Sequence, residues 1–366
     1  MRKGWEYKRW KEVLTIINGK NQSAVVDENG EYPIYGSGGI MGYANNWLCP
    51  ENCVIIGRKG NINKPIFVET KFWNVDTAFG LNANKEYLLP KFLYYFCLDY
   101  NFERHNKAVT IPSLTKADLL KIDIPLPPKS TQLAIVSELD KINELIRLKK
   151  EQLKDFDNLA QSLFYEMFGD PVENEMGWEV KTFGEIGSVE RGAGISKKDF
   201  VKEGLPCIHY GQLHTILGPR TTKHFTSIPH NLLPKYKIAH TGDLVMAITS
   251  EDVEGSCKST VWLGDYDIIV GSDAAIFHHK QDGTFLSYYT MTKAFFNEKA
   301  KYAKGFKVTH ISAKEIEKIP VYLPPLPLQR LFAQRIEQIE REKSEVQKSI
   351  QDLETLLASR MQYWFE

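Results

Sequence analysis

The chain has 366 residues, and its 46 acidic and 46 basic side chains give a formal net charge of zero at pH 7. This balance excludes a protein that coats nucleic acid through overall basic charge, so any such binding must come from local patches. No apolar run approaches the roughly 18 residues of a membrane-spanning helix. We therefore expect no membrane partner. The five cysteines show no framework of spacings, which favours a reduced, cytoplasmic location.

Residues 1–128 are predicted to form a globular domain that mixes strands and helices. Short apolar runs at 52–57 and 65–69 are bounded by turn residues, as strands are, and the aromatic segment 87–100 has helical spacing. The glycine-rich segment 36–42 lacks the lysine of a phosphate-binding loop and the third glycine of a dinucleotide fingerprint. We therefore interpret that segment as a tight turn.

Residues 129–169 are predicted to contain one long helix; about 37 helical residues at about 1.5 Å each span roughly 55 Å. Its apolar residues recur at alternating steps of four and three, which is the seam of a coiled coil. The predicted seam consists of Ile135, Leu139, Ile142, Ile146, Leu153, Phe156 and Leu163. Two prolines precede the helix and a Gly-Asp-Pro segment follows it, which favours a helix that begins and ends cleanly.

Residues 170–325 and 326–366 repeat this plan as a second globular domain and a second long helix. Gly-Trp-Glu at position 4 recurs at 177, and Leu-Pro-Pro at 126, followed by Gln132, recurs at 323, followed by Gln329. The second seam consists of Phe332, Ile336, Ile339, Val346, Ile350, Leu353 and Leu357. The predicted fold class is α+β: two similar α/β domains separated by two long helices in an antiparallel coiled coil, with pseudo-twofold symmetry from internal duplication.

Catalytic motifs are missing from the sequence. We find no tetrad for holding a flipped base, no glycine motif for S-adenosylmethionine, no Walker A sequence and no Gly-x-Ser-x-Gly elbow. The acidic residues of 243–273 fall at turns, and the histidines lack metal-ligand spacing. We therefore expect no catalytic residue, no metal and no cofactor in this chain.

Basic, polar and aromatic residues gather instead in loops. Arg58 and Lys59 directly follow a predicted strand, and residues 299–307 interleave four lysines with Tyr302 and Phe306. An offset of 197 places Arg104 on Lys301 and Lys107 on Lys304. This shared charge predicts contacts with phosphate groups, although a solvated helix face would give the same pattern.

The repeated Gly-Trp-Glu openings, the Leu-Pro-Pro…Gln signatures and the duplication resemble the specificity subunit of type I restriction-modification systems over nearly the whole chain. The phrases at 32–43 and 54–60 also resemble its target recognition domains. The resemblance implies that each globule reads one half of a bipartite site in double-stranded DNA. Globules at opposite ends of the paired helices would address half-sites roughly 34 Å apart.

The same resemblance implies the partners of the chain. The long helices would set the unread spacer and hold two modification subunits, which carry S-adenosylmethionine and methylate adenine. Motor-nuclease restriction subunits, which use ATP and Mg, would join for cleavage. The chain itself would have no catalytic activity, in agreement with the missing motifs.

The base-reading residues are not carried over from the family, so the candidates come from loop position and side-chain chemistry. In the first globule they are Ser37, Gly38, Tyr43, Arg58, Lys59 and Lys107. In the second they are Tyr210, Gln212, His214, Ser250, Lys258, Lys304, Lys307 and His310. A role in a turn or in the core is the alternative for each.

Three other functions remain open at the level of the sequence. The chain could be the recognition subunit of a related bifunctional restriction-methylation enzyme, or a coiled-coil adaptor that binds only protein. It could also be a nuclease with an unrecognised site.

Overall fold

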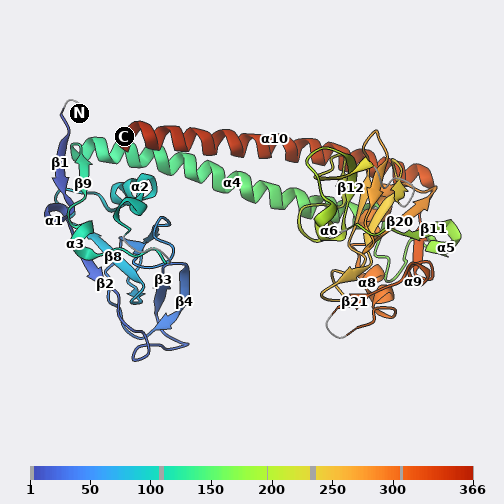
Figure 1. The fold of residues 1–366 in the computed structure, drawn as a ribbon, viewed down its shortest axis with the longest axis horizontal. Helices are drawn as coiled ribbons and strands as arrows, with labels where there is room; N and C mark the ends of the chain where they lie inside the picture. Colours follow the sequence, from blue (N-terminus) through green and yellow to red (C-terminus); the bar gives the residue numbers. More distant parts are fainter. Residues whose placement is uncertain (1–3, 107–110, 196, 231–235, 306–307, 366) are drawn as a thin grey trace. The chain divides into compact units, whose positions relative to one another are not determined.

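The structure is a computed structural model that describes residues 4–106, 111–195, 197–230, 236–305 and 308–365 (Figure 1). It divides into two compact units. The first unit comprises Met1–Glu151 and Val346–Glu366, and the second comprises Gln152–Glu345. None of the helices described has the length and apolar character that crossing a membrane requires.

The first unit is built on an antiparallel sheet in the order β2-β8-β5-β6, beside a smaller sheet in the order β4-β3-β7. All five residues of β5 are buried, because this apolar strand has neighbours on both edges and is covered on both faces. The strands are β1 (Glu6–Arg9), β2 (Leu14–Asn18), β3 (Tyr32–Gly36), β4 (Gly39–Ala44), β5 (Cys53–Gly57), β6 (Ile66–Val68), β7 (Trp73–Asn74), β8 (Ala78–Ala83) and β9 (Asp123–Leu126). The short helices are α1 (Trp10–Val13), α2 (Pro90–Asp99), η1 (Phe102–His105) and α3 (Lys116–Leu119).

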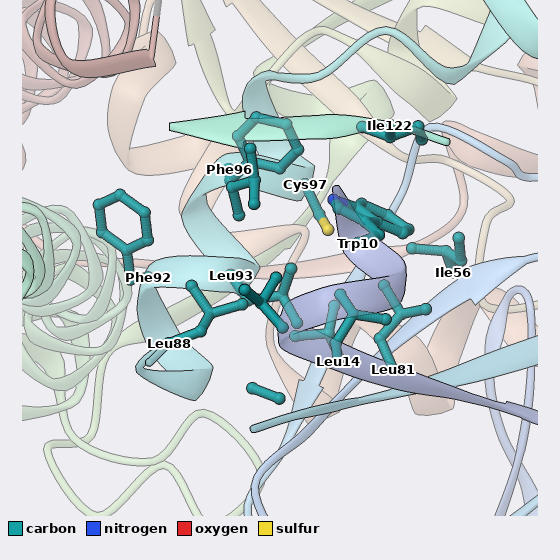
Figure 2. Packing of buried hydrophobic residues seen from close by; sticks show 14 of the residues in the cluster. Trp10, Leu14, Ile56, Leu81, Leu88, Phe92, Leu93, Phe96, Cys97 and Ile122 are labelled. Carbon is teal, nitrogen blue, oxygen red and sulfur yellow. The ribbon is translucent and has the colours of Figure 1, made fainter. Parts of the chain in front are cut away.

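The core of the first unit is aromatic. Figure 2 shows Trp10 near Cys97 and Phe96 of α2, whereas Phe92 lies at the other side of this helix. The Trp10 and Phe96 rings meet edge-on, with centroids 6.3 Å apart. Phe365, near the end of the chain, packs on Phe92 and Phe96 at centroid distances of 5.2 and 6.0 Å. The C-terminal helix therefore completes the core of the N-terminal globule.

The second unit contains a five-stranded sheet in the order β11-β20-β16-β18-β13 and a four-stranded sheet in the order β14-β12-β19-β15. Its strands are β10 (Glu179–Thr182), β11 (Gly187–Arg191), β12 (Leu205–Ile208), β13 (Arg220–Thr221), β14 (Thr226–Ile228), β15 (Lys237–Ala239), β16 (Leu244–Ala247), β17 (Thr249–Ser250), β18 (Ser259–Trp262), β19 (Ile268–Val270), β20 (Ala274–His279), β21 (Thr309–His310) and β22 (Pro320–Leu323). Its short helices are α5 (Phe183–Ile186), η2 (Lys197–Asp199), α6 (Tyr210–Thr215), α7 (Gly283–Tyr289), α8 (Lys293–Ala300) and α9 (Ala313–Ile316).

The segment 285–301, which has helical spacing in the sequence, forms two helices rather than one. Thr292 interrupts it with an extended backbone, and its side chain accepts a hydrogen bond from the backbone N–H of Phe295. Threonine favours such a capping position because its side chain satisfies a backbone donor at the start of a helix. The break turns the chain between α7 and α8.

Matching strand registers confirm the internal duplication. In the first unit β1 pairs with β9, and Glu6 lies opposite Leu126. In the second unit β10 pairs with β22, and Glu179 lies opposite Leu323. The sequence offsets of 173 and 197 therefore join equivalent residues of two similar folds.

The two long helices, α4 (Lys129–Phe168) and α10 (Leu326–Phe365), pair in antiparallel fashion (Figure 1). In the first unit the Arg360 guanidinium of α10 donates hydrogen bonds to Glu138, near the start of α4. In the second unit Lys343, in the first half of α10, donates to Asp157, at 2.7 Å, in the second half of α4. The antiparallel coiled coil that the sequence predicts is thus confirmed.

The predicted seam residues lie between the helices or against the adjoining cores. Most of the predicted seam residues are buried: Ile135, Leu139, Ile142, Ile146, Leu163, Phe332, Ile336, Ile339, Val346 and Ile350. Four seam residues are half-buried. They are Leu153 and Phe156 of α4, and Leu353 and Leu357 of α10.

Candidate functional sites

In the first unit, two predicted site segments that are far apart in sequence come together. Ser37 and Gly38 form the turn between β3 and β4, and residues 58–61 follow β5. The two segments are close to each other. If Gly60 had a Cβ atom, it would lie 4.0 Å from Ser37 Oγ, and a Cβ atom on Gly38 would lie 3.9 Å from the side-chain nitrogen of Asn61. Gly60 has a φ of +76°, which glycine tolerates best and which the turn requires.

The backbone of the loop after β5 is fixed, whereas its basic side chains are exposed. The backbone N–H groups of Arg58 and Lys59 both donate to the carbonyl of Thr77, at 2.8 and 3.2 Å. The Arg58 carbonyl accepts from the backbone of Leu114 at 2.9 Å, and the Arg58 guanidinium lies 5.9 Å from the ring centre of Phe79. An exposed arginine and lysine on a fixed backbone can reach guanine edges or phosphates at defined positions.

Tyr43 lies on β4 and is exposed, together with Ile40 and Met41 of the same strand. An exposed aromatic ring can stack on bases or pack against sugars. Lys107, the remaining candidate of the first globule, lies outside the residues that the structure describes.

In the second unit, four of the predicted site residues line one cavity of about 1220 Å³: Tyr210, His214, Ser250 and Lys258. Helix α6, the loop 251–258 and the ends of α7 and α8 form its walls. Aromatic and apolar side chains share the lining with charged ones, among them Phe296 and Lys293. A mixed surface of this kind can bind a ligand that has flat apolar faces and polar edges.

Two polar contacts connect α6 to the opposite wall of the cavity. His214 Nε2 lies 3.1 Å from the carbonyl oxygen of Thr249, and Lys258 Nζ donates to the His214 carbonyl at 3.4 Å. Tyr210 is exposed, and its ring meets that of His214 edge-on at a centroid distance of 6.0 Å. These contacts link His214 of α6 to Thr249 and Lys258 across the cavity.

Gln212, which was expected to face a bound molecule, is 4% exposed and has an internal role. Its side-chain oxygen accepts from the backbone N–H of His209 at 3.1 Å, as part of the capping box of α6. A glutamine at the third position of a helix favours this reciprocal cap. Ser250 is also buried, and its hydroxyl accepts weakly from the backbone of Asp252 at 3.4 Å.

Lys304 and His310 lie beside each other in the second unit. Lys304 and His310 exchange backbone hydrogen bonds of 3.2 and 2.9 Å, and His310 Nδ1 lies 3.3 Å from the hydroxyl of Thr249. Lys304 Nζ also donates to Glu315 at 2.5 Å. This bond and the cap at Ser312 lower the pKa of Glu315 to about 2. Lys307 lies outside the described residues.

Lys299, which the sequence groups with the exposed lysines of 299–307, is buried in the structure. Its ammonium group donates to the backbone carbonyls of Glu254 and Ser256, which are distant in sequence, so local pattern gave no signal of this burial. The local run of lysines predicts an exposed side chain, and this prediction is wrong for Lys299. Over the described part of the chain, no group of three or more His, Cys, Asp or Glu residues is placed to hold a metal ion.

Comparisons with known proteins agree with this geometry. A family model described as "Type I restriction modification DNA specificity domain" matches residues 2–155 and 175–355. The chain is 24% identical to the type I restriction enzyme MjaVIII specificity subunit of Methanocaldococcus jannaschii, covering 96% of this chain and 92% of that protein. It is 22% identical to the type I restriction enzyme EcoDI specificity subunit of Escherichia coli, covering 94% of this chain and 83% of that protein.

Solved structures share the fold. The S subunit of a type I restriction-modification system from M. genitalium superposes with a TM-score of 0.58 at 15% identity, covering 99% of this chain and 96% of that chain. A chain from a structure described as the basis of complex assembly and conformational transition of the type I R-M system gives a TM-score of 0.62 at 18% identity, covering 99% and 97%. At such identities the likeness establishes the fold alone.

Proposed function

Because the chain belongs to the family of type I restriction-modification DNA specificity domains, we propose that it is the sequence-specificity subunit of a type I restriction-modification complex. Each unit reads one half of a bipartite site in double-stranded DNA. The observation that carries this proposal is that the family match covers both repeats, whose opening and closing strands pair in the same register. Two related DNA-binding units in one chain match a recognition site that has two halves.

The two units offer different chemistry for reading DNA. The first unit presents Arg58 and Lys59 near the turn formed by Ser37 and Gly38. Tyr43 lies on β4, the strand that follows this turn. Arginine and lysine pair well with the O6 and N7 acceptors of guanine in the major groove, and each also binds phosphate. The second unit presents Tyr210, His214 and Lys258 around its cavity. Lys107, Lys304, Lys307 and His310 remain candidates for contacts with the DNA backbone.

The chain contributes recognition, and its partners contribute the chemistry. In this proposal two modification subunits carry S-adenosylmethionine and methylate adenine, and motor-nuclease subunits use ATP and Mg for cleavage in the cytoplasm. The long helices dock the modification subunits. Support comes from Leu159 on α4 and Leu356 on α10, which are related by the offset of 197 and are 50% and 45% exposed. Exposed leucines at equivalent places suit two copies of one partner.

The decisive experiment is to express the chain with its modification subunits in a host that lacks adenine methylation, and then to sequence the methylated sites. We expect one bipartite motif with a fixed unread gap, which disappears when this gene is omitted. Methylation without a motif, or a motif that persists without the gene, would refute the proposal.

A paired substitution assigns the half-sites. Arg58→Ala should relax the base preference in one half of the motif, and Lys258→Ala should relax it in the other. The loss of a good base contact reduces discrimination by about 1–3 kcal/mol. Both variants should retain the gap, which the same sequencing data measure. Relaxation of the same half by both substitutions would contradict the assignment of one half to each unit.

A substitution at Lys304 tests for a contact with the DNA backbone. Lys304→Ala should weaken binding to all sequences alike and lower the slope of log affinity against log salt by at most about one. The full value is an upper limit, because Lys304 must leave Glu315 to reach a phosphate. Titrations at several salt concentrations, on specific and unrelated DNA, measure the slope. A change confined to one base position would instead indicate that Lys304 reads a base.

A further inference from the structure

Lys299 is a lysine at a core position of the second unit. Lys299 is only 4% exposed. Its ammonium group donates hydrogen bonds to the backbone carbonyls of Glu254, at 2.8 Å, and Ser256, at 2.5 Å. The same nitrogen lies 5.5 Å from the ring centre of Phe296 and 5.9 Å from that of Phe295. The side chain thus reaches from α8 through an aromatic layer and ends on the backbone of a loop.

That loop, residues 251–258, forms one wall of the 1220 Å³ cavity and carries Lys258. Its conformation is closely constrained. Cys257 has a φ of +57°, which is uncommon for a residue other than glycine. A Cβ atom placed on Gly255 would come within 2.3 Å of Ser250 Oγ and within 3.3 Å of the His214 ring. The two carbonyls that Lys299 binds flank Gly255, so Lys299 fixes the loop at its closest approach to α6.

The first unit has an equivalent loop at the same place in the fold. Lys59 forms an isolated bridge with Ser113, just as Thr249 pairs with His310 in the second unit. The connection between the flanking strands is longer in the second unit, where it spans residues 248–258. A longer loop can adopt more conformations, so holding one of them requires additional contacts.

An apolar side chain is the usual occupant of a position as deeply buried as that of Lys299. In the first unit, for example, Phe102 is fully buried and packs on Trp10 and Tyr100 at centroid distances of 6.0 and 5.1 Å. An aromatic residue fills such a position without the desolvation cost of an ammonium group. Burial accordingly lowers the pKa of Lys299. The lysine therefore suits a task that packing alone does not perform, which is to hold two loop carbonyls.

We propose that Lys299 is a positioning residue for DNA recognition by the second unit: it fixes residues 254–256 and thereby sets where Lys258 stands on the wall of the cavity. The inference rests on the proposed function, because the bases that Lys258 meets belong to the half-site of the second unit. Lys299 also belongs to the lining of the cavity, but its ammonium group is engaged by the two loop carbonyls, so it acts through the loop. Its effect should consequently be confined to one half of the recognised motif.

The test uses the complete complex with its modification subunits and compares the methylated motifs and base-by-base competition binding of variants. Lys299→Met keeps the length and apolar stem but removes the donors, and Lys299→Arg keeps a charged donor of different shape. We expect discrimination at one or more positions of the half-site that Lys258→Ala affects to fall about tenfold. Discrimination in the other half-site, which Arg58→Ala affects, should stay unchanged. Lys318→Met, at an exposed lysine just after α9, is the matched control.

The outcomes separate this inference from the function on which it rests. Relaxation of one half-site by either Lys299 variant, with the other half intact, supports the positioning role. A folded Lys299→Met variant with an unchanged motif overturns it. Loss of methylation at every site by both variants also overturns it, because a purely structural role would affect both halves. If the unaltered complex gives no bipartite motif, the proposed function itself fails.

Discussion

Among single residues, Gln132 and Gln329 explain why the Leu-Pro-Pro…Gln signature occurs twice. Both glutamines are fully buried. The Gln132 side chain accepts from the backbone N–H of Leu89 at 2.9 Å and donates to the carbonyls of Tyr87 and Pro127 at 2.8 and 3.0 Å. Each glutamine therefore ties the start of a long helix to the segment that precedes a short helix of its own globule.

Gln329 makes the corresponding contacts in the second unit. Its side-chain oxygen accepts from the backbone of Asp282 at 3.1 Å, and its nitrogen donates to the carbonyl of Pro324 at 2.8 Å and to the side-chain oxygen of Gln281 at 3.0 Å. The two amides thus perform the same task in both repeats. A buried amide that satisfies several backbone groups at once is costly to remove, because the groups it leaves have no water to replace it.

We predict that Gln132→Ala lowers the free energy of unfolding by about 1–3 kcal/mol, because buried backbone groups lose their partner. Denaturant unfolding of the purified chain measures the change. Gln161→Ala, at an exposed glutamine of the same helix, is the matched control and should be nearly neutral. Equal stability of Gln132→Ala and the parent chain would show that water replaces the amide.

Glu315 makes the stability of the second unit dependent on pH. Because its pKa is lowered from 4.5 to about 2 in the folded chain, its stabilising contribution is complete above about pH 4.5 and is lost as the pH falls toward about 2. Glu315→Gln should therefore be less stable than the parent chain near neutral pH. The difference in stability between Glu315→Gln and the parent chain should decrease as the pH falls from about 4.5 to about 2. Thermal unfolding at a series of pH values measures this difference. A difference that is constant with pH would contradict the ionic origin.

Among the elements, α4 and α10 each pack into both units, and aromatic residues secure their ends. Phe332 of α10 is fully buried, with ring centroids 5.6 Å from Phe164 and 5.3 Å from Phe168. Phe285 of α7 packs on the same two phenylalanines of α4 at 5.7 and 5.0 Å. The cluster therefore joins α4, α10 and the core of the second globule.

We predict that Phe332→Ala costs about 3–5 kcal/mol of stability, because it removes a large buried ring and leaves a cavity. Leu331→Ala, at the exposed neighbouring residue, should change the stability of the isolated chain by less than about 0.5 kcal/mol. Calorimetry or denaturant titration compares the two variants. A small effect at Phe332 would indicate that the surrounding side chains close the cavity.

At the scale of the whole molecule, the pairing of α4 with α10 carries the proposal that the helices measure the unread gap in the DNA site. Lys150 pairs with Glu354 in the first unit, and Asp157 with Lys343 in the second, each at 2.7 Å. Counted in antiparallel order from the Lys150–Glu354 pair, residues 147–153 of α4 face residues 351–357 of α10. Removing both segments deletes one seven-residue repeat from each helix and keeps the seam in register.

We predict that this matched double deletion shortens the gap in the methylated motif by up to about three base pairs, because seven helical residues span roughly 10 Å and a base pair rises about 3.4 Å. Both half-sites should be retained. Deletion of 147–153 alone should abolish methylation, because the facing helix then has seven residues without a partner. Sequencing of methylated sites reads the gap directly, and an unchanged gap after the double deletion would contradict the measuring role.

The sequence by itself determined the duplication, the two long helices and the antiparallel pairing, because these follow from periodicity and from signatures repeated at fixed offsets. It also placed Arg58 and Lys59 in a loop, since both directly follow an apolar strand, and the structure shows that they are exposed. Only the tertiary structure decided that Ser37 lies beside Gly60, that Gln212 caps a helix and that Lys299 is buried beneath a loop. Those facts depend on contacts between segments distant in the chain, and local pattern carries no information about which distant backbone a side chain meets.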